Sequence, residues 1–361
     1  MIFNDSTELQ SNRTTNFGRH FNSTEDLPSW SWSPVFYLIV CICGIICNGT
    51  LLSLFIYDRH LRTPFNVYLI NLFSANMACL LVQYPLAVLS YRYPSGRWTM
   101  GNPACTLYLY CQSVLGAAII SFHALTAINR AWAILQPRSY RTLHSARLAW
   151  TLCGAMWVYI HTVEGAFLFA DTQWYRVDIA TMGCIFNNKA FPQWSNVNCL
   201  VVYMLPLCVV LTSCPLVVVN RVLRARQRLN RRVEAGLSID RRLSRAVSRG
   251  MPSAKRDGSN KFTILALLTI SVAMCSLPEM IFFLLVGFVP GFWQPTVFQV
   301  TAHLYSCQTI LDPILFGLAL ERLQNSLFKL CGPCKPRDRA PSTAAGGLFQ
   351  RSENISKQTE T

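Results

Sequence analysis

The apolar residues of this chain are gathered in long blocks separated by short polar stretches. A helix needs about 20 mostly apolar residues to cross the hydrocarbon of a bilayer. Blocks of that length recur seven times, and each contains scattered Asn, Ser, Gly or Pro, as is typical of membrane helices that pack on one another. We therefore expect seven membrane spans near Val35–Tyr57, Phe65–Tyr91, Cys105–Ile134, Ala146–Phe169, Trp194–Val222, Phe262–Phe288 and Phe292–Leu320.

The composition favours a membrane protein over two soluble domains. Of the 361 residues, 52% are hydrophobic and 14% are charged. Soluble proteins carry about a quarter charged residues. We expect an all-α integral membrane protein with one seven-helix domain over residues 34–330, preceded by a polar tail over 1–33 and followed by a polar, disordered tail over 331–361.

The basic residues predict the orientation of the spans. With the N-terminus outside, 26 of the 32 Lys and Arg residues fall in the four segments that face the cytoplasm. This matches the positive-inside rule, even though the long segment Arg221–Lys261 counts for less than short loops do. The net charge of +15 is then explained by the basic residues of the cytoplasmic segments, which also attract anionic lipid. We expect a multi-pass plasma-membrane protein that binds no nucleic acid.

The N-terminal tail agrees with an external location. Asn4, Asn12 and Asn22 each begin an Asn-X-Ser/Thr acceptor for glycosylation, and no Pro intervenes. Further matches at Asn48 and Asn354 fall in the membrane and the cytoplasm, so we expect them to be unused. The first 30 residues lack the apolar core of a cleaved signal peptide, so the first span would direct its own insertion.

Two of the fifteen cysteines stand apart from the rest. Most cysteines lie inside spans, where they act as small apolar packing residues. Cys105 opens the third span at its outer end, and Cys184 lies in the outer loop between spans four and five. Both face an oxidising compartment. We expect a disulfide between them that pins the loop over the bundle.

A series of short motifs then follows the spans in order. They are Cys47-Asn48-Gly49, Leu61-Arg62-Thr63-Pro64-Phe65-Asn66, Asn71-Leu72, Trp98-Thr99-Met100-Gly101, Cys105 with Arg130 25 residues later, Pro137, Trp157, Pro206, Pro278, and Asp312-Pro313-Ile314-Leu315-Phe316. In these motifs, the chain resembles the class A, or rhodopsin-like, G protein-coupled receptors from about Val35 to Leu330.

The resemblance implies a fold and a mechanism. It implies a seven-helix bundle with a short amphipathic helix at Glu321–Leu330, at whose end Cys331 and Cys334 would be palmitoylated. Two free cytosolic thiols remain the alternative for these cysteines. An external small molecule or peptide would bind between spans three, five, six and seven. The sixth span would then tilt about Pro278 and admit a G protein, or arrestin, beside Arg130.

The signalling residues depart from the family pattern. The Asp/Glu-Arg-Tyr triplet is replaced by Asn129-Arg130-Ala131, so the acid that pairs with the Arg is missing. Arg130 itself is either this signalling residue or an interfacial Arg that snorkels. The usual Trp is absent from Cys275-Ser276-Leu277-Pro278. Phe316 and Cys214 stand where relatives have Tyr hydroxyls. A receptor that binds ligand but couples weakly, as a decoy or scaffold, is therefore the second interpretation.

A pair of substitutions in spans two and seven looks reciprocal. Asn76 stands where relatives mostly have Asp, and Asp312 stands where they mostly have Asn. A carboxylate in the middle of a span needs a partner. We expect Asp312 to pair with Asn76 and Asn48 in an intramembrane polar network, although a neutral, hydrogen-bonded carboxyl would also be tolerated.

Five residues are candidates for the ligand pocket. Glu279 follows Pro278 and shares a helical face with Ser276. It either pairs with a cationic ligand or snorkels to the outer surface. Gln112 stands where aminergic receptors carry Asp, and Ser306 stands where visual pigments carry the retinal Lys, so both classes are disfavoured. Asn198 on the fifth span is a weaker candidate.

Other classes of protein fit less well. A transporter would show inverted repeats, broken helices or several midplane charges, and only Asp312 is clearly at midplane. The sequence has no phosphate-binding loop, no metal-ligand cluster and no hydrolase nucleophile motif. We expect neither an enzyme nor a bound metal or cofactor.

Overall fold

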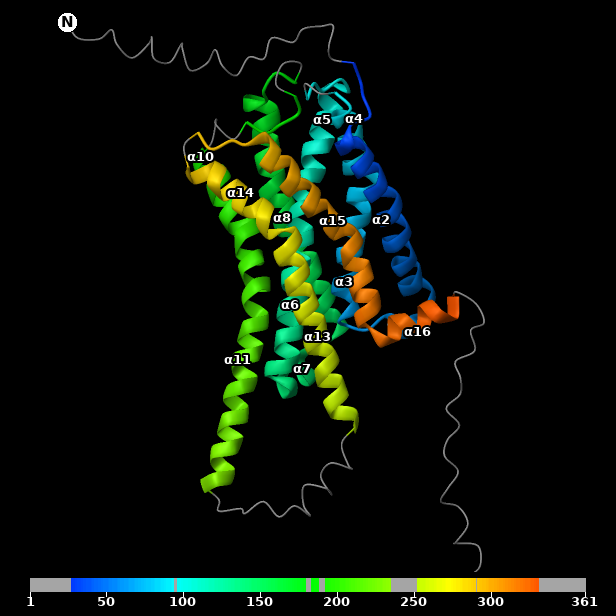
Figure 1. The fold of residues 1–361 in the computed structure, drawn as a ribbon, viewed down its shortest axis with the longest axis vertical. Helices are drawn as coiled ribbons and strands as arrows, with labels where there is room; N and C mark the ends of the chain where they lie inside the picture. The colour runs from blue at the N-terminus through cyan, green and yellow to red at the C-terminus, as the bar shows by residue number, and fades with distance from the viewer. Residues whose placement is uncertain are drawn as a thin grey trace, which may run out of the picture.

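The computed structural model describes residues 27–93, 96–179, 183–187, 192–234, 252–289 and 291–330. Regular structure in these ranges is entirely helical, and the long helices lie side by side in one bundle (Figure 1). The expected all-α bundle of seven spans is confirmed.

The first span is the single helix α2 (Trp32–Tyr57) and the seventh is α15 (Pro295–Ala319). The five spans between them are built from consecutive segments. The second span consists of α3 (Asn66–Ala78), η2 (Cys79–Gln83) and α4 (Tyr84–Tyr91), and the third of α5 (Gly101–Tyr110), η3 (Cys111–Leu115) and α6 (Gly116–Leu135). The fourth consists of α8 (Ala146–Ala170) and η4 (Asp171–Tyr175), the fifth of α10 (Pro192–Asn198), η5 (Cys199–Met204) and α11 (Leu205–Glu234), and the sixth of α13 (Pro252–Cys275) and α14 (Leu277–Phe288). Short helices outside the spans are η1 (Arg59–Leu61), α7 (Pro137–Leu143) and α16 (Glu321–Leu330).

Wide helical turns interrupt spans two, three and five and end span four, and two of them precede a proline. The π turns η2 and η5 come just before Pro85 and Pro206. A proline lacks the backbone N–H of its turn and its ring crowds the carbonyl four residues earlier. A local π turn accommodates both effects and leaves the span continuous.

The sixth span is bent more sharply. Its two helices α13 and α14 meet at Ser276 with a bend of 45°. Pro278 occupies the first turn of α14, where its missing N–H costs no intrahelical bond. The proline therefore begins a second helix at the place where the resemblance expects the hinge of the sixth span.

Apolar length alone identifies six of the seven spans. Five spans are long and apolar enough to cross a membrane, and the bent pair α13–α14 makes a sixth. The seventh, α15, has 25 residues, which at about 1.5 Å each is long enough to cross, but it buries polar side chains including Gln308 and Asp312. Helices that face a bundle interior tolerate such residues.

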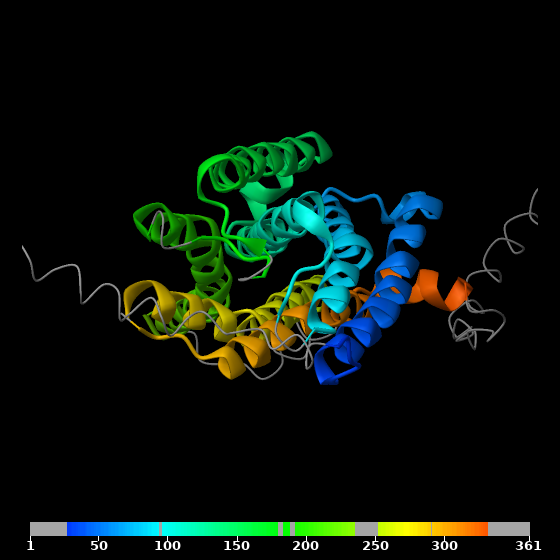
Figure 2. The same cartoon turned by 90° about the horizontal axis from the view of Figure 1, so that it is seen from above.

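The third span lies near the middle of the bundle (Figure 2). Its side chains are the most buried of the spans, and α6 packs against α3, α8, α11 and α13. The first span is peripheral, and its Ile39, Ile42 and Ile46 are exposed as expected for contact with lipid. Gly44 on its inner face leaves room for Leu80 of the second span.

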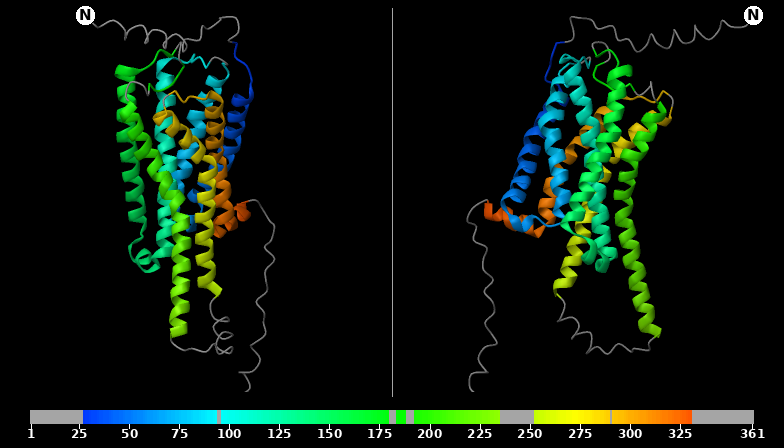
Figure 3. Two further views of the ribbon diagram at one scale, coloured as in Figure 1. Left: turned by 60° about the vertical axis from the view of Figure 1, so that its left-hand side comes forward. Right: turned by 180° about the vertical axis from the view of Figure 1, so that it is seen from behind.

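One end of the bundle, here called the α16 end, carries the connecting helices α7 and α16. There α16 lies across the bundle axis, and α11 and α13 project beyond the other spans (Figure 3). Both helices run past the expected limits Val222 and Phe262. The α16 helix is held by buried Leu323 and by Ser326, whose hydroxyl donates to Asp58 at 2.7 Å.

Candidate functional site: a buried polar network and a switch region

Asp312 lies at the centre of a polar network inside the bundle. Its carboxylate is buried on α15 and has partners on two other spans. Asn76 Nδ2 donates to Oδ2 at 3.2 Å, and His123 Nε2 lies 3.0 Å from Oδ1. The expected contact between Asn76 and Asp312 is thus present in the structure, and a histidine of the third span completes the site.

The network continues from the third span to the sixth. Gln308 Nε2 lies 3.2 Å from His123 Nε2, and Gln308 Oε1 accepts a hydrogen bond from Ser276 Oγ. Ser276, which we expected in the ligand pocket, therefore uses its hydroxyl within the bundle. Polar residues of spans two, three, six and seven are joined in one chain of contacts.

Asn48 does not join this chain in the expected way. Its amide donates to the backbone carbonyls of Gly44 at 2.9 Å and Thr309 at 2.8 Å. The expected pairing with Asp312 is replaced by a bond between α2 and the backbone of α15. Because the Asn48 amide already donates to these two carbonyl oxygens, the Asp312 carboxylate has its partners on α3 and α6 instead.

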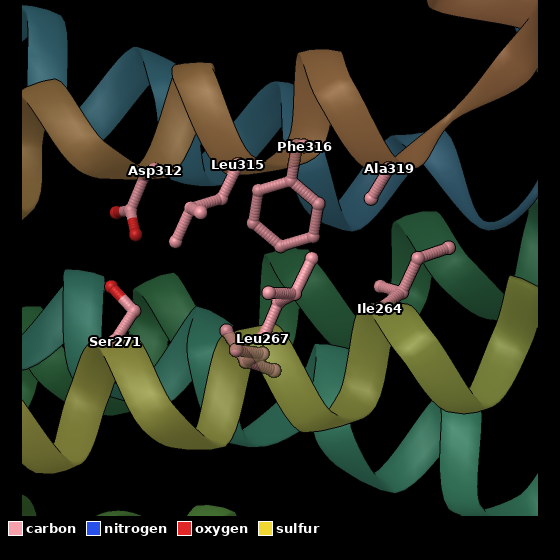
Figure 4. A pocket seen from close by; sticks show the side chains of 8 residues that line it. Ile264, Leu267, Ser271, Asp312, Leu315, Phe316 and Ala319 are labelled. Atoms are coloured by element: carbon pink, nitrogen blue, oxygen red, sulfur yellow. The ribbon is translucent and has the colours of Figure 1, made fainter.

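A small cavity of about 10 Å³ lies beside Asp312 between α13 and α15 (Figure 4). Asp312 and Ser271 form its polar wall, and the ring of Phe316 lies next to them. The remaining walls are apolar and include Ile264 and Leu267. The Ser271 hydroxyl is buried and has no hydrogen-bond partner.

Arg130 lies buried near the α16 end of α6. Its guanidinium carbon is 3.0 Å from the centroid of the Phe65 ring, which is a cation–π contact with the residue that precedes α3. Neighbouring Asn129 and Ala131 are also buried. Pro313, within α15, lies next to Asp312 and is buried too.

Asn129 has partners that the sequence did not indicate. Its Nδ2 lies 2.8 Å from His144 Nε2, and its Oδ1 accepts from the Tyr140 hydroxyl at 3.2 Å. Both partners belong to the connection between spans three and four. Burial, followed by the nearby Arg130 charge, lowers the pKa of His144 below its usual value. Imidazole is therefore favoured over imidazolium at this position.

A disulfide joins Cys105 to Cys184 as expected, with the two Cα atoms 5.6 Å apart. It ties the loop that follows η4 to the start of α5. Trp98 packs beside it, and its indole N–H donates to the Gly101 carbonyl at 2.9 Å. The loop is thus fixed at the end of the bundle opposite α16.

Glu279 lies in the first turn of α14 and is only 7% exposed. It is within electrostatic range of tyrosines on α2, α4, α5 and α15, and no salt bridge joins it to a basic side chain in the described ranges. These tyrosines are Tyr37, Tyr84, Tyr91, Tyr108 and Tyr305. A side chain that snorkels to the surface would be exposed, so the buried position favours a role inside the bundle.

The other pocket candidates are not gathered around Glu279. Asn198 donates to Glu164 Oε1 at 3.1 Å, which joins α10 to α8. Ser306 donates to the His303 carbonyl in its own helix at 2.9 Å, and Gln112 lies half-buried in η3. Glu164 is 1% exposed and was missed in the sequence, although any acid inside a span signals a buried partner.

Several predicted modification sites cannot be placed. The acceptors Asn4, Asn12 and Asn22 and the lipidation candidates Cys331 and Cys334 lie outside the described residues. Within the described ranges, no cluster of three or more His, Cys, Asp or Glu side chains is arranged to hold a metal ion.

Comparisons with known proteins identify the fold as that of a receptor. The family described as "7 transmembrane receptor (rhodopsin family)" matches residues 47–316. The mouse KiSS-1 receptor is 24% identical over 330 residues, which cover 86% of this chain and 78% of that receptor. Human cysteinyl leukotriene receptor 2 is 28% identical over 156 residues, covering 43% of this chain and 44% of that receptor. Melanopsin from Rutilus rutilus is 35% identical over 124 residues, covering 34% of this chain and 24% of that protein.

Proposed function

This chain belongs to the rhodopsin family of seven-transmembrane receptors and is a G protein-coupled receptor, and we propose that its ligand pairs a positive charge with Glu279. The family is one of receptors and not of enzymes, and its members are multi-pass membrane proteins. The remaining question is which chemistry the ligand brings to the bundle.

The burial of Glu279 carries this proposal. A carboxylate removed from water is costly unless a charge or hydrogen bonds compensate it. Tyrosines lie within electrostatic range of Glu279, and no salt bridge reaches it from a basic side chain of the described ranges. A ligand ammonium or guanidinium would supply the missing charge. The surrounding aromatic rings also attract cations.

The names of the relatives do not select a ligand. One is named for KiSS-1 and others for cysteinyl leukotrienes, and these receptors share 24–28% identity with this chain in the alignments above. Melanopsin is also among the matches, but Ser306 stands where the resemblance expects the retinal lysine of a visual pigment. We therefore base the proposal on Glu279 and not on any relative.

The orientation and the coupling surface are part of the proposal. We place the α16 end in the cytoplasm of a plasma-membrane receptor and the Cys105–Cys184 end outside, in agreement with the distribution of basic residues. A G protein would then bind beside Arg130, between the projecting ends of α11 and α13. Arrestin would use the same face.

A ligand screen followed by one substitution tests the proposal. Amines, basic peptides and neutral compounds would be screened for G-protein recruitment. Glu279→Gln should weaken a cationic agonist more than tenfold, which is about 1.4 kcal/mol, and leave neutral agonists unchanged. Glu164→Gln is the matched control, because this second buried glutamate already bonds to Asn198. Equal potency of a cationic agonist on the Glu279 variant and the wild type would remove Glu279 from the pocket.

A further inference from the structure

His144 connects three elements at the α16 end of the bundle. The residue follows α7 and precedes α8, in the second cytoplasmic connection. Its ring stacks on Tyr140 of α7 at 4.5 Å and on Tyr68 of α3 at 6.1 Å, and its Nε2 lies 2.8 Å from Asn129 of α6. Trp132 meets the ring edge-on at 6.1 Å. Tyr140 of the same connection also bonds to Asn129, through its hydroxyl, at 3.2 Å.

The position of α7 depends on these few contacts. This helix has seven residues, and none of them is buried. Isolated helices shorter than about 12 residues are marginal in water, so α7 needs contacts with the bundle to hold one position. Tyr140 and His144 supply such contacts through the Asn129 amide and the Trp132 ring, and Ser139 Oγ accepts a hydrogen bond from the Trp132 indole N–H at 3.3 Å.

The hydrogen bonds define the protonation state that the contact needs. The Tyr140 hydroxyl donates to Asn129 Oδ1, so the amide presents its N–H to His144. The facing Nε2 must then accept, which requires a neutral ring with its proton on Nδ1. A protonated ring would set one N–H against another.

The charges around the ring favour the same state. Titratable neighbours are Tyr68 on α3, Arg130 on α6 and Tyr140 on α7. Arg130 is the cation among them, and its charge opposes a second positive charge on the ring. Arg147 of α8 is exposed to solvent, which screens it.

We propose that His144 is a positioning residue for G-protein coupling, whose neutral ring holds α7 against Asn129 and whose protonation releases it. The idea rests on the coupling surface proposed above. When α7 is already fixed in place, the G protein binds it without the loss of conformational entropy that ordering the helix would require. Release of α7 therefore weakens G-protein binding.

The direction of the pH dependence follows from the lowered pKa. The docked ring binds a proton less readily than a free histidine, whose pKa is about 6.5. Docking is therefore fully favoured above that pH and is lost as the pH falls below it. One proton changes the docking equilibrium by at most about tenfold for each pH unit.

The test uses the full-length receptor in lipid nanodiscs. Binding of purified heterotrimers, one from each major G-protein class, is measured without nucleotide at about pH 7.5 and about pH 6, which bracket the titration of histidine. We expect wild-type affinity to fall about twofold to fourfold at the lower pH, since one proton on a group with a free pKa of about 6.5 can change the docking equilibrium by no more than about fourfold over this interval. His144→Gln keeps an acceptor for Asn129 but cannot titrate, so its affinity should be the same at both pH values. His144→Ala should bind weakly at both.

Controls separate this proposal from the coupling itself. His60 is exposed in the first cytoplasmic connection, and His60→Gln should keep the wild-type pH response. Amide hydrogen exchange of residues 137–144, compared at the same pH, should be faster in wild type than in His144→Gln only at the lower pH. If hydrogen exchange shows this pH dependence while no heterotrimer binds, the proposed coupling surface is wrong, and the docking of α7 by neutral His144 is still supported. A wild-type pH response in His144→Gln, in either measurement, overturns the role of His144.

Discussion

Three of the residues that we expected to depart from the family pattern, Asn76, Asn129 and Asp312, have hydrogen-bonding partners on other elements. Asp312 and Asn76 exchange the usual places of acid and amide and still form one hydrogen bond between spans two and seven. His123 adds a partner from the third span, so both carboxylate oxygens are used. Asn129, which stands where the resemblance expects an acid, forms hydrogen bonds with His144 and Tyr140.

Removal of the Asp312 carboxylate should destabilise the bundle. Asp312→Ala leaves the donors of Asn76 and His123 buried without an acceptor, at about 1–3 kcal/mol for each unsatisfied group. Asp312→Asn keeps one acceptor and should lose less. The Tm of the purified receptor in detergent measures the difference. Equal Tm values for Asp312→Ala and the wild type would show that the network contributes nothing to stability.

A carboxylate at position 129 should restrain the receptor. Asn129→Asp places an anion beside both Arg130 and His144, and charge-assisted hydrogen bonds are about twice as strong as neutral ones. Basal signalling, assayed at equal surface expression, should fall. The anion also favours protonated His144, so the binding of purified G protein should no longer weaken as the pH falls. A variant with wild-type basal signal would contradict the restraint.

The helices show how far the sequence predicts the architecture. The apolar blocks predicted all seven spans, including the seventh, although α15 buries polar side chains such as Gln308 and Asp312. The π turns were not predicted, because they change the local pitch without changing the apolar pattern. His123 and His144 were missed for another reason. Each is a single polar residue, and its partners lie far away in sequence or across a connection.

The disulfide should be required for the loop between spans four and five. Cys105→Ser or Cys184→Ser frees that loop from α5, and loss of a native disulfide typically costs about 2–5 kcal/mol. Surface expression, measured with an antibody to an N-terminal tag, should fall in each single variant. The double variant should fall no further, because either change already breaks the bond. Normal expression of the double variant would make the bridge dispensable.

The whole molecule is asymmetric along the bundle axis. One end carries the disulfide that fixes a loop to α5, and the other carries α7, α16 and the projecting helices α11 and α13 (Figure 3). A receptor needs two such unlike ends, one for ligand and one for the G protein. The buried network around Asp312 lies between them and joins four of the seven spans. A change in packing at one end can therefore shift the other.

The orientation of that axis is open to a direct test through glycosylation. Oligosaccharide is added only on the side of the membrane that becomes external, so Asn4, Asn12 and Asn22 should be modified if the N-terminus is outside. Changing all three to Gln should abolish the mobility shift that a glycosidase produces on a gel of the expressed receptor. Asn354→Gln is the matched control, because its acceptor Asn354-Ile355-Ser356 lies beyond the seventh span and should stay unmodified. A shift that survives the triple change and disappears with Asn354→Gln would reverse the topology, and with it the assignment of the α16 end to the G protein.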